Sequence, residues 1–404
     1  MSLTAPKALR LQIALTGKVN AGKSSFLNLV TGQETAIASA VPGTTTDVVE
    51  KNQELLPIGP VTWLDTAGFG DDTELSVQRI EKTRKVFDRA DVILLVTDSP
   101  LADETEQAII VEAEKRKLPV LKIYNKADTY TAPADGIAVN SLDKASRDKV
   151  LVQLKSALLR LCPDDFIHTP PLFGDLVPAG SSVLLLIPID KEAPKGRLIM
   201  PQVQAIREGL DYNLIVSAVT ENRYAEALAA CKKAPDLVIC DSQIVDFMTA
   251  HTPPDIKCTT FSTLFARLKG DLGKFAEGAA VISKLKDGDK VLIAECCTHH
   301  AVEDDIGKVK IPHWLKEKTG KNLQIDFCAG RDFPENLSAY RLVIQCGGCM
   351  FGRREILARI NACEAAGVAI TNYGIGISEM KNVLPRILEP FGQVFQDYKM
   401  AKNP

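Results

Sequence analysis

Histidine is scarce in this 404-residue sequence, with only five residues, and charge of either sign is nearly balanced. A formal net charge of −3 indicates no general attraction to nucleic acid or to a membrane surface. Long apolar runs are missing too, since the longest, residues 183–187, is far shorter than the ~20 residues of a membrane helix. Residues 1–10 have no apolar stretch typical of an export signal. We therefore expect a cytoplasmic protein with no membrane partner and no nucleic-acid partner.

Cysteine, in contrast, occurs ten times. Ten in this length is too dilute for a disulfide scaffold, and a reducing compartment keeps thiols free. Clustered cysteines are then more typical of metal binding or redox chemistry. The remaining composition, 46% hydrophobic and 25% charged, is that of a globular protein. The length indicates two to three domains.

Apolar strands alternate with helices in the first part of the chain. This pattern predicts a parallel sheet covered on both faces. The expected strands are residues 11–16, 61–65, 92–97 and 120–124, and the expected helices are residues 23–30, 77–87, 106–116 and 145–161.

A proline-rich break at residues 162–178 precedes two further α/β units. In the middle unit we expect strands at 183–187, 214–219, 237–240 and 257–261 and helices at 203–210, 223–232 and 244–250. It carries no catalytic constellation, which favours a structural or association module. In the last unit we expect strands at 290–294, 323–327, 341–344 and 368–371. The predicted fold class is therefore α/β with three domains, at residues 8–168, 173–262 and 263–404.

Residues 17–24 have the pattern G-x-x-x-x-G-K-S between an expected strand and an expected helix. The glycines let backbone N–H groups close around phosphate oxygens, and the helix N-terminus favours negative charge. Lys23 is expected to reach the β- and γ-phosphates, and the Ser24 hydroxyl to bind Mg²⁺. This pattern predicts a P-loop nucleotide site.

Two motifs at strand ends indicate which nucleotide binds. Asp65 begins Asp-Thr-Ala-Gly, so that its carboxylate can hold the water shell of Mg²⁺ and the Gly68 N–H can meet the γ-phosphate. Asp128 ends Asn-Lys-Ala-Asp and offers two oxygens to the two N–H donors of guanine, which adenine lacks. Strand ends are where α/β sheets bind ligands. GTP is the expected nucleotide.

A Pro-Gly-Thr-Thr-Thr-Asp loop at residues 42–47 lies between these motifs. With it, residues 8–160 resemble the small GTPases of the TrmE–Era class, because four motifs occur in order. The resemblance implies a switch threonine at Thr45, which also ligands Mg²⁺. The catalytic set it implies is Lys23, Thr45, Asp65 and Gly68. The nucleotide-binding set is Asn20, Ala21, Gly22, Lys23, Ser24, Ser25, Asn125, Lys126, Asp128 and Ser141.

Two departures from that class bear on the rate of hydrolysis. Thr46 replaces the usual arginine after the switch threonine, and Phe69 stands where Ras-like proteins carry a water-orienting glutamine. An apolar ring cannot orient water, so hydrolysis is expected to be slow or assisted. Asn20 is at the position where related GTPases bind a potassium ion, which predicts K⁺ activation. The alternative is that Asn20 only stabilises its loop.

Cysteines gather at two strand ends of the last unit. Cys346-Gly-Gly-Cys349 follows one expected strand, and Cys297-Thr-His299 follows another. Three thiolates and one variable ligand suit an iron–sulfur cluster. A zinc site, a redox pair and inert thiols stay open as alternatives. His299 is either the fourth ligand or a solvated histidine.

The whole chain then resembles the HydF family, the GTPase maturation factors of FeFe-hydrogenase. The segments 295–300, 304–307, 346–350 and 371–374 carry the resemblance, together with the loop at 42–47. It implies a 4Fe–4S cluster held by Cys297, Cys346 and Cys349. The fourth iron would be bound by His299, by Glu303 or Asp304, or by an exchangeable ligand, since Gln345 replaces the second histidine often found in the family.

The same resemblance implies the partners. The protein would be a homodimer through its middle unit, and would receive a diiron precursor from two radical-SAM maturases and hand it to the hydrogenase. The remaining cysteines are read as packed thiols, with Cys296 and Cys328 close to the cluster. The alternative function is a TrmE–Era-type GTPase that acts on RNA or the ribosome and carries a structural zinc.

Overall fold

The structure is a computed structural model. It describes residues 10–32, 49–65, 86–162, 170–189, 198–296, 305–330, 332–334, 336–348 and 351–403. The chain divides into two compact units, residues 1–169 and 170–404. The division of the second unit at residues 262–263 stays a prediction.

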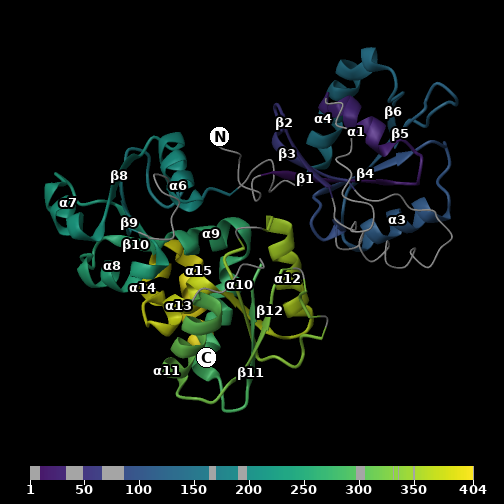
Figure 1. The fold of residues 1–404 in the computed structure, drawn as a ribbon. Helices are drawn as coiled ribbons and strands as arrows, with labels where there is room; N and C mark the ends of the chain where they lie inside the picture. Colours follow the sequence, from purple (N-terminus) through teal and green to yellow (C-terminus); the bar gives the residue numbers. More distant parts are fainter. Residues whose placement is uncertain are drawn as a thin grey trace. The chain divides into compact units, whose positions relative to one another are not determined.

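The first unit contains a six-stranded sheet in the order β2-β3-β1-β4-β5-β6 (Figure 1). All neighbours are parallel except β2, which runs antiparallel to β3. The strands are β1 (Leu11–Gly17), β2 (Val49–Leu55), β3 (Gly59–Asp65), β4 (Val92–Thr97), β5 (Val120–Tyr124) and β6 (Gly136–Ala138). The described helices are α1 (Lys23–Thr31), α3 (Glu104–Lys115) and α4 (Arg147–Leu161), which follows a 3₁₀ turn at Lys144–Ser146.

Two apolar cores cover the two faces of this sheet. Phe26 of α1 and Leu154 of α4 pack on one face, and Ile109 of α3 packs on the other. Strands β1 and β4 are buried along their whole length. This is the covered parallel sheet that the sequence predicts, and its carboxyl edge presents the loops that follow β1, β3, β4 and β5.

The second unit contains two four-stranded parallel sheets. The first has the order β10-β9-β7-β8. Its strands are β7 (Ser182–Leu186), β8 (Ile215–Val219), β9 (Leu237–Cys240) and β10 (Lys257–Thr260). Its helices are α6 (Met200–Asp211), α7 (Tyr224–Ala230), α8 (Val245–His251) and α9 (Phe261–Lys269), with 3₁₀ turns at Glu221–Arg223 and Ser242–Ile244.

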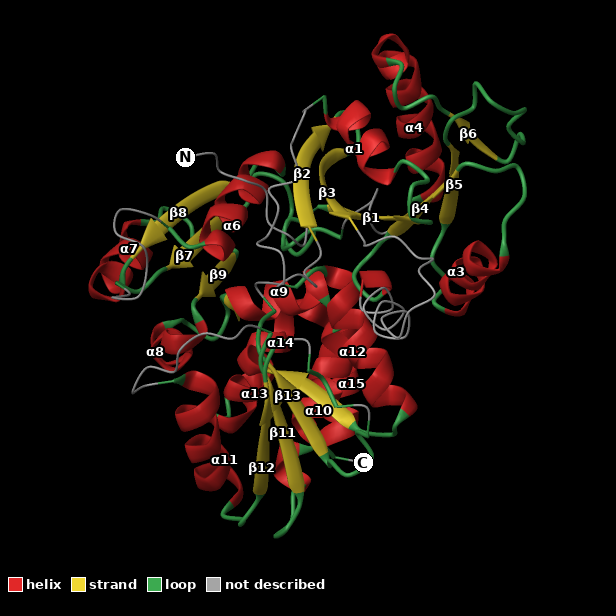
Figure 2. Cartoon of the chain, turned by 45° about the vertical axis from the view of Figure 1, so that its right-hand side comes forward, coloured by secondary structure: helices red, strands yellow, loops and turns green. Residues whose placement is uncertain are grey.

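The last sheet has the order β12-β11-β13-β14, and Figure 2 shows helices to either side of it. Its strands are β11 (Lys290–Ala294), β12 (Gln324–Cys328), β13 (Leu342–Gln345) and β14 (Ala369–Asn372). The helices are α10 (Leu272–Ala280), α11 (Ile311–Thr319), α12 (Arg353–Ala365), α13 (Tyr373–Met380), α14 (Leu384–Leu388) and α15 (Gly392–Lys402). Shorter helical segments are Ile282–Lys284, Ile306–Lys310 and Glu389–Phe391.

The C-terminal helices join the two sheets of the second unit. Ile387 of α14 is fully buried in the core of the middle sheet. Arg386 donates hydrogen bonds to the carbonyls of Pro253, Pro254 and Ile256, just before β10. These contacts explain why residues 170–404 form one compact unit.

Most predicted elements are found within one or two residues, and the differences have local causes. Helix α3 begins at Glu104 rather than residue 106, because Asp103 and Glu106 form a capping box. Strand β2 was not predicted, since its polar sequence lies at the sheet edge. The helix expected at 77–87 lies almost entirely outside the described residues. Among the described helices, none has both the length and the apolar character to cross a membrane.

Candidate nucleotide and cysteine sites

The loop at residues 17–24 joins β1 to α1. Gly17, Asn20 and Gly22 have positive φ values of 145°, 63° and 93°. A Cβ at Gly17 would lie 2.1 Å from the Val96 carbonyl oxygen, so that only glycine fits there. The described residues supply no side-chain cap to α1, whose first N–H groups are therefore available to phosphate oxygens.

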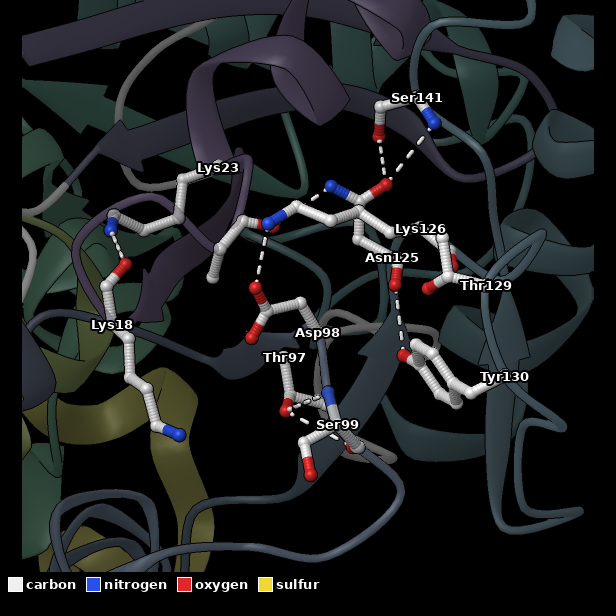
Figure 3. Close-up of polar contacts among 11 residues, drawn as sticks. Lys18, Lys23, Thr97, Asp98, Ser99, Asn125, Lys126, Thr129, Tyr130 and Ser141 are labelled. Atoms are coloured by element: carbon white, nitrogen blue, oxygen red, sulfur yellow. Dashed lines mark hydrogen bonds and ion pairs between the residues drawn. The ribbon is translucent and has the colours of Figure 1, made fainter.

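Lys23 lies beneath this loop, with 9% of its surface exposed. Its Nζ donates to the Lys18 carbonyl oxygen at 2.6 Å (Figure 3). It also donates to the Gly17 carbonyl oxygen at 3.0 Å. Burial lowers the pKa of the Lys23 ammonium, and the Asp65 carboxylate opposes that shift. Burial likewise raises the pKa of Asp65, against the effect of Lys23. The two charges therefore interact where the sequence predicts phosphate and Mg²⁺.

Asn125, at the end of β5, connects three segments through hydrogen bonds (Figure 3). Its Nδ2 donates to the Ala21 carbonyl oxygen at 2.8 Å, and its Oδ1 accepts from the Ser141 N–H at 3.1 Å and from Oγ at 2.7 Å. Its own carbonyl accepts from the Tyr130 hydroxyl at 2.8 Å. Asn125 is only 3% exposed. The hydrogen bonds of Asn125 thus join the phosphate loop to the expected guanine-binding loops.

The other expected nucleotide ligands lie at the surface of the same edge. Ser24, Asn20 and Asp128 are exposed, and Ser25 is half-buried. Lys126 has a φ of 54°, and its Nζ pairs with Asp98 at 2.6 Å. Solvent exposure keeps the Asp128 carboxylate accessible to the guanine base of a nucleotide. Their role as ligands stays a prediction.

Sequence reasoning did not include three residues that shape this site. Asp98 follows β4 directly, and its place at a strand end was the signal that could have identified it. Tyr130 supports Asn125, and Lys18 pairs with Asp103 at 2.8 Å. The sequence gives no signal for these last two. Thr45 and Gly68, by contrast, lie outside the described residues.

At the second site, Cys346 follows β13 and Cys296 follows the neighbouring strand β11. The backbone N–H of Cys296 donates to the Cys346 Sγ at 3.1 Å. A side-chain hydrogen bond from Cys296, N–H groups of Gly348 and Cys296, and the charge of Arg359 lower the pKa of Cys346 to about 6, although burial opposes them. The lowered pKa of Cys346 favours the thiolate, which is the form that binds metals.

The backbone around Cys346 is specific to glycine. Gly348 has a φ of 64°, and a Cβ there would lie 2.6 Å from Ile356 Cδ1. The buried ammonium of Lys269 donates to the Gly348 carbonyl oxygen at 2.9 Å. Helix α9 therefore holds the turn after Cys346 in place.

Cys296 itself is 4% exposed and contacts Cys346, so it is packed, as expected, but directly at the site. Away from the site, burial raises the pKa of Cys162 and Cys258 to about 11 and that of Cys363 to about 12. Such thiols stay protonated and unreactive. Cys346 differs from these three in the direction of its pKa shift.

Cys297, His299 and Cys349, together with Glu303 and Asp304, lie outside the described residues. Within the described part, no three side chains of the metal-binding types converge on one point. Gln345, which replaces the family's second histidine, is 1% exposed, and its Oε1 has no hydrogen-bond partner in the described structure. An amide oxygen is a poor iron ligand, so the fourth ligand stays open.

Comparison with known proteins assigns the three segments. Residues 172–270 match the model of the hydrogen maturase F dimerization domain, and residues 273–390 match the tetramerization domain of the same family. Together these models cover more than half of the chain. The chain belongs to the hydrogen maturase F (HydF) family. Residues 12–126 of this HydF chain match a model described as 50S ribosome-binding GTPase, which confirms the predicted P-loop GTPase domain and α/β fold class.

Two curated relatives each match about a third of the HydF chain or less. The tRNA modification GTPase MnmE of Synechococcus sp. (strain RCC307) is 34% identical over 155 residues, which are 38% of this chain and 33% of that protein. The MnmE of Nitrosomonas europaea is 36% identical over 124 residues, 30% of this chain and 27% of that protein. The chain thus spans about a third or less of these relatives. A crystal structure of Aquifex aeolicus Era, 17% identical, covers 54% of this chain and 97% of Era, with a TM-score of 0.29.

Proposed function

We propose that this protein is a GTP-hydrolysing scaffold in the maturation of FeFe-hydrogenase. It binds a 4Fe–4S cluster and carries a diiron precursor, received as cargo from radical-SAM maturases, to the hydrogenase in the cytoplasm. The observation that carries the proposal is membership of the HydF family, in a chain that joins a GTPase domain to a thiolate at a strand end. No nucleic acid or membrane takes part.

GTP hydrolysis is assigned to the site at the carboxyl edge of the first sheet. Lys23 neutralises the β- and γ-phosphates, and Ser24, Thr45 and Asp65 hold Mg²⁺ and its water shell. The Gly68 N–H contacts the γ-phosphate. Because Phe69 cannot orient water, hydrolysis is slow and is assisted by K⁺ bound at Asn20.

The cysteine site suits an iron–sulfur cluster in its donor chemistry. Cys346 is held as a thiolate, and the Cys296 N–H already contacts its sulfur, as N–H groups contact cluster sulfurs. Cys297 and Cys349 supply the other two thiolates, with His299 or an exchangeable group as the fourth ligand. The cluster supplies an anchoring point for the diiron cargo, and the chain binds and shields it.

The middle sheet supports assembly of two copies. Strand β8 is an edge strand, so one side of its backbone is unpaired in the described sheet. Nearby apolar side chains are exposed, including Leu210 (59%) and Ile215 (61%). Exposed edges with apolar side chains favour pairing with another strand. We propose a homodimer through β8 and α6, with tetramers formed through the last unit, as the domain names indicate.

Light scattering tests this assembly. Ile215→Lys places a charge beside the edge and is expected to halve the particle mass, whereas Leu101→Lys, at an even more exposed apolar residue of the first unit, leaves the mass unchanged. An Ile215→Lys protein with the wild-type mass contradicts the β8 interface.

Anaerobic reconstitution with iron and sulfide tests the cluster. The wild type is expected to turn brown, with charge-transfer absorption and an EPR signal after reduction. Cys346→Ser loses both, because serine supplies no thiolate. Cys363→Ser is the matched control, since Cys363 is buried in α12 with a pKa of about 12. A colourless protein that holds zinc contradicts the proposal.

The second candidate is a GTPase that acts on RNA and carries a structural zinc. It is favoured by the names of the relatives that match the first unit, MnmE and a 50S ribosome-binding GTPase. RNA pull-down at physiological salt distinguishes the two functions, because a scaffold for hydrogenase maturation is expected to retain no RNA.

A further inference from the structure

Arg359 of α12 is a buried cation at the cysteine site. Only 5% of its surface is exposed. Its Nη1 donates to the Cys296 Sγ at 3.7 Å, and its Nη2 donates to the Gly330 carbonyl oxygen at 2.6 Å. Cys296 in turn donates its N–H to the Cys346 Sγ. Arg359 thus contacts Cys296, which in turn contacts Cys346, the expected cluster ligand.

Two aromatic rings fix the guanidinium in place. Its central carbon lies 4.7 Å from the Phe333 ring centre and 4.8 Å from the Phe351 ring centre. At these distances a cation is attracted to the face of an aromatic ring, which stabilises the guanidinium in its position between the chain and the two rings. Because the rings and the Gly330 carbonyl hold the group, it cannot reach water without local unfolding.

Arg359 has no carboxylate partner among the residues that the structure describes. A buried charge without an opposite charge is strongly unfavourable, and an arginine cannot lose its proton to avoid this. The one group in contact with it, among the described residues, that can carry negative charge is the Cys296 thiol. Its charge also acts to lower the pKa of Cys328, Cys346 and Cys363, although burial outweighs it at Cys328 and Cys363.

We propose that Arg359 is the buried counter-cation of the iron–sulfur cluster, a positioning residue that favours the reduced form of the cluster. The inference rests on the proposed function. It gives a role in that function to a residue that is not itself an expected iron ligand. A 4Fe–4S cluster with three thiolates is negatively charged, and reduction adds to that charge. A fixed cation nearby therefore raises the reduction potential. Lys269, bound to the Gly348 carbonyl, is a second buried cation beside the same turn.

The test measures the reduction potential of reconstituted full-length protein by spectroelectrochemical titration, followed by EPR. Arg359→Gln removes the charge, and Arg359→Lys keeps it. Arg359→Met is a second neutral variant in case the glutamine variant does not fold. Arg341→Gln is the matched control, because Arg341 is exposed next to the start of β13, at the opposite end of the strand from Cys346. Thermal unfolding verifies that each variant is folded.

The neutral variants are expected to have a lower potential than the wild type and a weaker EPR signal at a fixed dithionite concentration. The lysine variant stays near the wild type, and Arg341→Gln does not change. A folded neutral variant that takes up no cluster, while the lysine variant does, also supports the proposal.

Equal potentials in all proteins overturn the inference alone. Folded glutamine and lysine variants that both fail to take up a cluster overturn it as well, because charge is then not the required property. A wild type without a cluster contradicts the proposed function and the inference together.

Discussion

The nucleotide site and the cysteine site differ in how they are prepared for a ligand. At the nucleotide site, Asn125 and Lys23 have protein hydrogen-bond partners. At the cysteine site, the buried Arg359 contacts the Cys296 thiol and the Gly330 carbonyl but no carboxylate among the described residues. The first site is arranged by hydrogen bonds, and the second contains a positive charge that an anion would neutralise.

This difference indicates how each site gains affinity. A preorganised hydrogen-bond network costs little to order when GTP binds, so that its affinity depends on geometry. A buried cation costs folding free energy until an anion neutralises it, so that ligand binding also stabilises the fold. A substitution that distorts the backbone or the hydrogen bonds is therefore expected to weaken ligand binding most at the nucleotide site. A substitution that removes a charge is expected to weaken it most at the cysteine site.

The largest expected effect is a difference in thiol reactivity. In cluster-free protein, alkylation of Cys346 by iodoacetamide rises with pH and levels off above about pH 7, because its pKa is lowered to about 6 and the thiolate is lost as pH falls through that value. Cys363, with a pKa of about 12, stays protonated. At pH 7.5 we expect Cys346 to react more than about a thousandfold faster, because Cys363 is fully buried in addition to being protonated. Mass spectrometry of alkylated peptides over pH 5–9 measures both, and equal rates contradict a charged cysteine site.

Asp128→Ala is expected to weaken GTP binding by about a thousandfold, because two charge-assisted hydrogen bonds of about 2 kcal/mol each are lost. Calorimetry with GTP and ATP measures the change. Asp143→Ala, at the N-cap of a neighbouring turn, is the control and leaves affinity unchanged. A variant that still prefers GTP over ATP shows that Asp128 does not read the base.

Gly22→Ala tests the geometric coupling in the nucleotide site. Its Cβ would lie 2.0 Å from the Asn125 Nδ2 at a φ of 93°, so the link between the two loops must shift. We expect about a hundredfold weaker GTP binding, from about 1–3 kcal/mol of overpacking. Gly320→Ala is the control, because its φ is 66° and the space around it is open. Equal affinity in both variants contradicts the coupling.

Buried parallel strands were the most predictable part of the fold. Strands β4, β5, β9 and β11 have the predicted bounds, because continuous apolar runs between turns identify strands that are covered on both faces. Strand β2 was missed, since its polar residues at an edge resemble a loop. Asp305 caps the helical segment at Ile306–Lys310, because its side chain accepts a hydrogen bond from the Lys308 N–H.

The sequence alone identified the GTPase domain and predicted the cysteine site, because a P-loop, a guanine motif and paired cysteines are local patterns of residue type and spacing. Tertiary structure decided which residues support them. Asn125 meets Ala21 across 104 positions, and Arg359 meets Cys296 across 63. Such contacts depend on strand register and helix packing, which bring residues together only when the sheet forms. A buried arginine facing a thiol therefore leaves no signature in the linear sequence.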